Sequence, residues 1–265
     1  MSGSAADLPQ DEAAQLRRKG WERYNFSDLE GALAAFDDAL KLDATDGQAL
    51  AGKGVTLAAQ QAYEPAIEAL TAAIDQIPDF SLAWYYRAEA RRALVQIEAA
   101  LVDYDRSLEL APRDQTYVGR GLARVSIGEM EAALADFTHP IDLNPKHAQA
   151  FLCRAQVLAY VERLPAALAD FDQAARLELN DLELYQGRAM VRLRRGDLAG
   201  AVADYRQALE LDRGDWRLWM NLALALQTLE QTEAATQAVQ EASALVSDED
   251  RAEYEALRAV LDEID

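Results

Sequence analysis

The chain repeats one short pattern of residues about every 34 positions. An alanine holds the same place in every copy, and the intervals between successive alanines are 34, 34, 33, 34, 34 and 34 residues. A period of about 20 to 50 residues is typical of solenoid proteins, in which each unit buries its apolar face by stacking on its neighbours. The period therefore predicts an extended stack with a long surface rather than a closed domain around a deep catalytic pocket. The seven alanines are Ala32, Ala66, Ala100, Ala133, Ala167, Ala201 and Ala235.

Apolar residues within each copy recur at helical spacing in two blocks, and turn residues separate the blocks. In the first block a small residue marks where a second helix approaches closely, and in the second block a large residue fills the space beside it. Each copy is therefore predicted to form two short antiparallel helices. The small residues are Gly20, Gly54, Ala88, Gly121, Ala155, Ala189 and Ala223, and the large ones are Phe36, Leu70, Tyr104, Phe137, Phe171, Tyr205 and Val239.

Each copy also begins with a large residue four positions before the small one, and it continues as Ala-x-x-x-aromatic-x-x-Ala, often followed by proline. This pattern resembles the tetratricopeptide repeat, whose period is 34 residues. The resemblance implies an all-α fold: a right-handed superhelical solenoid of seven antiparallel helix-turn-helix repeats, with the first helices on the concave face. It also implies that the concave groove binds peptide segments of other proteins. The first large residues are Leu16, Leu50, Trp84, Tyr117, Phe151, Tyr185 and Trp219.

The repeats divide the chain into three predicted segments. Residues 1–12 are small and polar, and we expect a flexible N-terminal segment without a signal peptide. Residues 13–247 hold the seven repeats, and residues 248–265 are expected to form a capping helix. Ser247 is a suitable N-cap residue for this helix, because the acidic residue Asp250 follows three positions later. The apolar stripe expected to cover the last repeat consists of Tyr254, Leu257, Val260 and Leu261.

Pro140 departs from the pattern. It occupies a slot of the second helix that holds alanine in several other copies, and it lacks the N–H that would bond the carbonyl of Asp136. We therefore expect this helix to kink or to end early. The single 33-residue interval shortens the same copy near Arg113, so the fourth repeat is predicted to be the irregular one. Tolerated drift and a functional kink both remain open as explanations.

A pair of opposite charges follows the repeat. Four copies carry an arginine just before the small residue of the first helix and an aspartate just before the large residue of the second. The planar guanidinium suits a bidentate bond to a carboxylate, so these residues are interpreted as structural ion pairs in the seam between the helices and not as a phosphate site. The predicted pairs are Arg87 with Asp103, Arg120 with Asp136, Arg154 with Asp170, and Arg188 with Asp204. The other copies have Lys19, Lys53 and Leu222 in the first slot and Ala35, Ala69 and Ala238 in the second.

Residues that point away from the second helix are expected to line the concave groove. Aromatic, methionine and aliphatic residues are frequent among them, as in many partner-binding surfaces. The inward positions hold five arginines and two glutamates, a net charge of +3 in a chain of net charge −20. We therefore expect a groove for an apolar or aromatic segment with neutral to acidic flanks. The proposed contacts are Arg17, Trp21, Tyr24, Tyr85, Tyr86, Arg92, Leu122, Leu152, Gln156, Tyr160, Met190, Arg194, Met220 and Asn221.

Several functions are not expected. The excess of 46 acidic over 26 basic residues disfavours nucleic acid, and no apolar run is long enough for membrane insertion. His139 and His147 are interpreted as a loop pair rather than metal ligands, and Cys153 lacks a base that would make it a nucleophile. We expect no cofactor, no metal and no catalytic residues. One cysteine cannot form an internal disulfide, which fits a cytoplasmic protein.

The leading hypothesis is a non-catalytic scaffold or adaptor that binds a peptide or subunit segment of another protein. One alternative is a structural protein that assembles with further copies of itself. Another is a regulatory or assembly subunit of a larger enzyme complex. The partner is not identified by the sequence.

Overall fold

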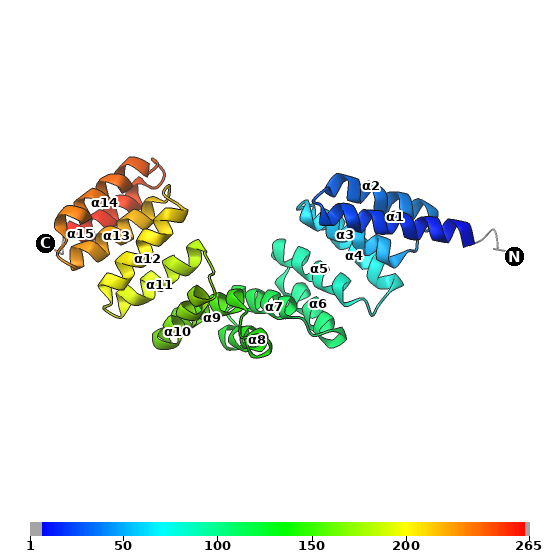
Figure 1. Ribbon diagram of the computed structural model, residues 1–265, viewed down its shortest axis with the longest axis horizontal. Helices are drawn as coiled ribbons and strands as arrows, with labels where there is room; N and C mark the ends of the chain where they lie inside the picture. The colour runs from blue at the N-terminus through cyan, green and yellow to red at the C-terminus, as the bar shows by residue number, and fades with distance from the viewer. Residues whose placement is uncertain (1–6, 263–265) are drawn as a thin grey trace. The chain divides into compact units, whose positions relative to one another are not determined.

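The computed structural model describes residues 7–262, and the backbone in this range forms fifteen α-helices and no strand (Figure 1). The helices alternate as first and second members of successive hairpins. The first members are α1 (Asp7–Asn25), α3 (Gly47–Ala59), α5 (Ser81–Ala93), α7 (Asp114–Ser126), α9 (Ala148–Tyr160), α11 (Leu182–Arg194) and α13 (Trp216–Thr228). The second members are α2 (Leu29–Leu42), α4 (Tyr63–Gln76), α6 (Ile97–Leu110), α8 (Met130–Leu143), α10 (Leu164–Arg176), α12 (Leu198–Leu211) and α14 (Thr232–Leu245), and α15 (Arg251–Asp262) follows.

Each first helix packs against the second helix of its own repeat and against the repeats next to it within the same unit. Helix α3, for example, contacts α4, α2 and α5. The sequence prediction of an all-α array of seven helix-turn-helix repeats with one additional helix is therefore confirmed.

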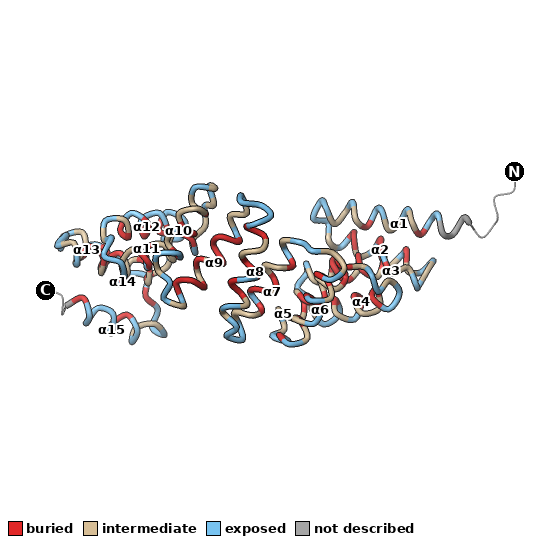
Figure 2. Tube along the Cα trace, turned by 90° about the horizontal axis from the view of Figure 1, so that it is seen from below, coloured by how far each residue is buried: buried red, intermediate tan, exposed pale blue. Residues whose placement is uncertain are grey.

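The array divides into two compact units, and the boundary falls between His139 and Pro140. Each unit has a core of its own, because buried residues follow the inner sides of the helices in both (Figure 2). The sequence predicted one undivided segment over residues 13–247 and gave no sign of this boundary, although it predicted an irregularity at the same proline.

The small and large residues of the pattern meet between the paired helices. Phe36 is fully buried, and a methyl group at Gly20 would lie 2.7 Å from its ring. Gly121 approaches the buried Phe137 in the same way. These contacts explain why the first helix needs a small residue at this position, since close-packed interiors have no room for an extra methyl group.

The turn between the two helices of every repeat contains one residue in the left-handed backbone region. Gly128 and Gly196 hold this position in two repeats, with φ near +80°. In the other five repeats a residue with a side chain takes the same conformation, at Ser27, Gln61, Val95, Glu162 and Glu230. The spacing of these seven residues reproduces the repeat period, so the turn geometry is kept although its sequence is not.

Helix α1 begins earlier than predicted. Its first residue is Asp7, so residues 7–12 are helical and not part of a flexible segment; residues 1–6 lie outside the described residues. Pro9 falls in the first turn, where backbone N–H groups have no partner within the helix and proline is tolerated. The sequence prediction was wrong here because it relied on apolar periodicity, which starts only after this turn.

Helix α8 does not end early at Pro140. It continues to Leu143 and is as long as α6, both having 14 residues. Ile141 is buried directly after the proline, and the N–H of Asn144 donates to the carbonyl of Pro140 over 2.9 Å. Packing and this last hydrogen bond therefore offset the one that the proline removes.

The C-terminal helix packs on α13, the first helix of the seventh repeat. Ser247 Oγ accepts the N–H of Asp250 over 3.2 Å, and the helix itself starts one residue later, at Arg251. Of the predicted apolar stripe, Tyr254 and Leu261 are buried, whereas Leu257 and Val260 are 37% and 49% exposed. The expectation that this whole stripe covers the last repeat is therefore only half correct.

Candidate partner-binding site

All four predicted arginine–aspartate pairs are present in the seam between the paired helices. Arg87 donates from Nε and Nη2 to the two carboxylate oxygens of Asp103 over 2.9 and 2.7 Å. The pairs of Arg120 with Asp136, Arg154 with Asp170 and Arg188 with Asp204 have equivalent donors, with shortest distances of 2.6, 2.7 and 2.7 Å. The four aspartates are buried, so each carboxylate needs such a partner.

A second arginine, one helical turn further along, contacts the same carboxylate in three of the four repeats. Sequence analysis missed this contact. Arg91 donates to Asp103 over 2.7 Å, Arg124 to Asp136 over 2.8 Å and Arg192 to Asp204 over 2.8 Å. The fifth repeat has Leu158 at this place, and that leucine is buried. The spacing of four residues between the two arginines was the available signal, because it places both on one face of the helix.

The first arginine of the seam also bonds to the preceding repeat. The acceptor follows the large core residue of the previous second helix. Arg87 donates to Thr71 over 3.0 Å, Arg120 to Asp105 over 2.6 Å and Arg188 to Asp172 over 3.2 Å. Lys53 pairs with Asp37 over 2.8 Å in the same way. These bonds link successive repeats, and we call them, together with the seam pairs, the ion-pair ladder.

Each ladder arginine also lies over the first large residue of its own helix. The guanidinium carbon of Arg87 lies 4.8 Å from the ring centre of Trp84, and those of the other three lie 5.5 to 5.8 Å from Tyr117, Phe151 and Tyr185. The hydrogen bond to Asp170 raises the pKa of Arg154 above its ordinary value. The ladder arginines thus contact carboxylates and aromatic rings of the protein itself, which supports their interpretation as structural residues.

A first groove lies along the first helices of the N-terminal unit, on the side predicted to face inward. It has a volume of about 290 Å³ and is formed by α1, α3, α4 and α5. Four tyrosines dominate it, and burial raises the pKa of the Tyr85 and Tyr86 hydroxyls, which therefore stay uncharged. We call this surface the tyrosine groove; its lining residues are Tyr24, Val55, Ala58, Ala59, Tyr63, Tyr85, Tyr86, Glu89, Ala90, Arg92 and Ala93.

A second groove lies on the C-terminal unit, mainly between α9, α11 and α13, and its volume is about 620 Å³. Tyr160 and Met190 are 73% and 47% exposed there, so both present apolar surface to the groove. We call it the methionine groove. Its lining residues are Gln156, Ala159, Tyr160, Glu162, Phe171, Glu183, Gln186, Gly187, Met190, Leu193, Arg194, Tyr205 and Asn221.

The two grooves hold nine of the fourteen residues proposed from the sequence. The tyrosine groove contains Tyr24, Tyr85, Tyr86 and Arg92, and the methionine groove contains Gln156, Tyr160, Met190, Arg194 and Asn221. The other five lie outside both grooves: Arg17, Trp21, Leu122, Leu152 and Met220.

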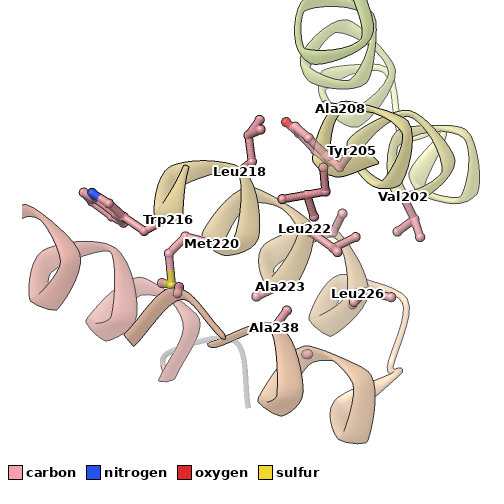
Figure 3. Close-up of a cluster of buried hydrophobic side chains, with 14 of the residues drawn as sticks. Val202, Tyr205, Ala208, Trp216, Leu218, Met220, Leu222, Ala223, Leu226 and Ala238 are labelled. Atoms are coloured by element: carbon pink, nitrogen blue, oxygen red, sulfur yellow. The ribbon is translucent and has the colours of Figure 1, made fainter. Parts of the chain in front are cut away.

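Two of these five are corrections, because they offer no surface to a partner. Leu152 is fully buried, and Met220 is 2% exposed in the core on which α15 packs (Figure 3). Trp21 is half-buried and packs edge-on against Phe36 with ring centres 5.3 Å apart. Leu152, Met220 and Trp21 pack between neighbouring helices instead of facing a groove. The spacing of residues in the sequence does not distinguish these two kinds of position.

Four of the five arginines that the sequence places on the inward face form ion pairs, and the predicted positive groove is not observed. Arg92 bonds Glu89 over 2.8 Å, and Arg194 bonds Glu162. Outside the grooves, Arg17 bonds Asp46 over 2.6 Å and Arg217 bonds Glu253 over 2.6 Å. Several of these acids lie in neighbouring repeats, in turns or in the last helix, so the inward positions of the first helices do not include them.

The remaining reactive side chains have local structural contacts. His139 lies in helix α8 rather than in a loop and stacks on Tyr117 with ring centres 3.9 Å apart. His147 caps α9 by accepting the N–H of Ala150 over 3.2 Å. Burial raises the pKa of the Cys153 thiol. Among the residues that the structure describes, no three His, Cys, Asp or Glu side chains gather as a metal site, and no helix could cross a membrane.

The chain is similar to a known protein family and to several solved structures. The sequence model of the tetratricopeptide repeat family matches residues 17–79 and 187–263 of the chain. A structure described as the APC/C hetero-tetramer Cut9–Hcn1 aligns with 82% of the chain at 19% identity and a TM-score of 0.71, and the chain spans 43% of that protein's length. A tetratricopeptide repeat protein from Parabacteroides merdae aligns over 96% of this chain and 99% of its own, at 20% identity and a TM-score of 0.65. YrrB, described as a repeat protein with an unusual peptide-binding site, aligns over 74% and 98% at 16% identity and a TM-score of 0.58. At such identities the likeness shows the fold alone.

Proposed function

Since the chain belongs to the tetratricopeptide repeat family, we propose that it is a non-catalytic scaffold or adaptor that holds a peptide or subunit segment of another protein in its inward grooves. One observation carries this proposal. Eight lining positions of the tyrosine groove lie 101 residues before eight lining positions of the methionine groove, which is three repeats. Examples are Tyr85 with Gln186 and Glu89 with Met190. The same part of the repeat therefore forms a concave surface twice, with different side chains.

The chemistry of the lining residues favours an apolar or aromatic segment. Tyrosine and methionine provide large contact area, and tyrosine loses little side-chain entropy when a partner binds. Arg92 and Arg194 already bond glutamates of the same groove, so a carboxylate of the partner would have to displace them. Affinity is therefore expected to come mainly from buried apolar area, with the ion pairs at the edge of the contact.

The comparisons are consistent with this class of function. One similar structure is described as having a peptide-binding site, and another as part of a hetero-tetramer. We infer in addition that the protein acts in the cytoplasm, since its one cysteine is buried and free. A partner that stays bound through gel filtration would favour a subunit of an enzyme complex over a transient adaptor.

Affinity capture from cells of the source organism tests the proposal. The variant is Tyr160→Ala/Met190→Ala, because both side chains are exposed and their loss should leave the fold intact. The control is Val102→Ala, an exposed apolar residue on the second helix α6 whose exposure of 65% lies between those of Tyr160 and Met190. We expect at least one partner to be lost with the groove variant and kept with the control. Identical partners with all three proteins would contradict groove binding.

Self-association is the second candidate, and one observation favours it. Leu257 and Val260 lie exposed on α15 although they continue the stripe that packs on the last repeat. A second copy could cover them. If so, sedimentation should show a concentration-dependent dimer that Leu257→Glu/Val260→Glu abolishes; a monomer at all concentrations would reject this candidate.

A further inference from the structure

The ion-pair ladder stops before the seventh repeat. Its arginine slot holds Leu222 and its aspartate slot holds Ala238, both buried. The preceding second helix carries Arg206 in the slot where Asp37, Thr71, Asp105 and Asp172 accept hydrogen bonds from the next repeat. Arg206 therefore places a cation where other repeats have a hydrogen-bond acceptor. The basic residue that would donate to such an acceptor is also missing, because Leu222 replaces it.

A cavity of about 310 Å³ occupies this junction, between α12 and α14 on the side of the second helices. Leu222 points from α13 toward α12, and together with Leu226 and Ala238 it contributes to an apolar floor (Figure 3). The cavity is separate from the methionine groove, because the two share no lining residue. Its residues are Arg206, Leu209, Glu210, Arg213, Trp219, Leu222, Leu226, Ala234, Gln237 and Ala238.

Trp219 in this cavity has a direct counterpart in the third repeat. The indole N–H of Trp84 donates to the carbonyl of Pro78 over 2.8 Å, and that of Trp219 donates to the carbonyl of Arg213 over 3.1 Å. The ring of Trp84 is covered by the guanidinium of Arg87. Trp219 has no such cation in the described part of the chain, since leucine replaces the arginine three residues later.

Two arginines stand at the rim of the apolar floor. Arg206 and Arg213 are exposed, and within residues 7–262 neither side chain has a hydrogen bond or an ion pair. The only acid among the lining residues is Glu210, which accepts from Gln207 over 3.2 Å. The lining charges are thus two positive and one negative, a net of +1 in a chain of net charge −20.

We propose that this cavity binds a segment of another protein in which a carboxylate side chain stands next to a leucine or phenylalanine. The unpaired guanidinium groups match a carboxylate, and the leucine floor matches the apolar side chain. A volume at the lower end of ligand pockets suits one anchoring side chain better than a cofactor. The acidic character of the whole chain opposes a polyphosphate or nucleic acid at this place.

Fluorescence anisotropy with two labelled hexapeptides tests the site. The acidic probe is Ser-Asp-Leu-Phe-Glu-Gly and the neutral probe is Ser-Asn-Leu-Phe-Gln-Gly, both with amidated C-termini. We expect the full chain to bind the acidic probe at least about tenfold more tightly. The variant Arg206→Ala/Arg213→Ala should lose this preference. The control Arg18→Ala/Arg195→Ala, which removes the same charge from exposed positions elsewhere, should keep it.

A second variant tests the cavity itself. Leu222→Arg/Ala238→Asp rebuilds the missing seam pair, fills the apolar floor and should abolish binding of both probes. The proposal is overturned if both probes bind equally well, if the two arginine variants weaken binding equally, or if no binding occurs up to about 1 mM probe. It is also overturned if Tyr160→Ala/Met190→Ala removes the binding, because the groove and not the cavity would then hold the probe.

Discussion

At the scale of single residues, the buried aspartates of the ladder differ in how many cations they neutralise. Asp103 accepts from Arg87 and Arg91 and has no exposed side-chain surface. Asp170 accepts from Arg154, and the second arginine of its seam is replaced by Leu158. Removal of a buried carboxylate takes away the negative charge that its cations bond, so the loss of stability should follow the number of these cations.

We therefore predict that Asp103→Ala lowers the free energy of unfolding by about 3–5 kcal/mol. Asp170→Ala should lower it less, by about 2–3 kcal/mol, since the lost carboxylate bonds one guanidinium instead of two. Urea denaturation of both variants, followed by circular dichroism, measures the difference. Equal losses, or a larger loss for Asp170→Ala, would show that the second arginine does not stabilise the seam.

Among the single residues, the sequence predicts the ion pairs within a repeat but not the bonds between repeats. The pairs within one repeat were predictable because both partners recur at constant positions. The bonds between repeats, such as Arg120 to Asp105, were not predicted because the acceptor slot varies between aspartate and threonine. Groove membership was ambiguous for a similar reason: Leu152 and Gln156 are one helical turn apart, yet one is buried and the other lines a groove.

At the scale of the elements, the turn inside each repeat keeps its backbone conformation even with unfavourable residues. Val95 has φ of +59°, a region in which a β-branched side chain is strained, and its side chain is 77% exposed. Val95→Gly should therefore raise the free energy of unfolding by up to about 1 kcal/mol, after the greater entropy of glycine in the unfolded chain is subtracted.

Val102→Gly is the matched control for this prediction. It makes the same chemical change at an exposed position in the interior of α6, where glycine should lower stability by some tenths of a kcal/mol. Thermal unfolding of the two variants measures both effects. A loss of stability in Val95→Gly would indicate that the turn is not strained.

The helices themselves were largely predictable, since a strong 34-residue period and helical spacing gave the number, order and pairing of the repeats. The predictions of helix ends were wrong where an interaction other than apolar periodicity determines the end. Helix α8 continues past Pro140 because Ile141 packs in the core, and α1 extends back to Asp7 through a first turn that tolerates proline. Neither effect leaves a periodic trace in the sequence.

At the scale of the whole molecule, the charge of the chain and the charge of its grooves differ. The net charge is −20, but the tyrosine groove contains one glutamate and one arginine, which bond each other. Binding of an apolar segment in such a groove should depend little on ionic strength. We predict that partner capture persists at about 0.5 M NaCl, where exposed charges are screened beyond a few ångströms. Loss of capture at that salt concentration would point to the acidic outer surface as the contact.

The central claim is that the inward grooves hold a partner segment, and site-specific photo-crosslinking tests it most directly. A photoreactive phenylalanine analogue would replace Tyr160 in the methionine groove or, as a control, Val102 on α6. The account predicts that the crosslinker at position 160 captures a peptide of another protein in cells, that mass spectrometry finds this peptide rich in apolar residues, and that position 102 does not capture it. Equal capture of the same peptide from position 102, or no product from position 160 while the partner still copurifies, would contradict it.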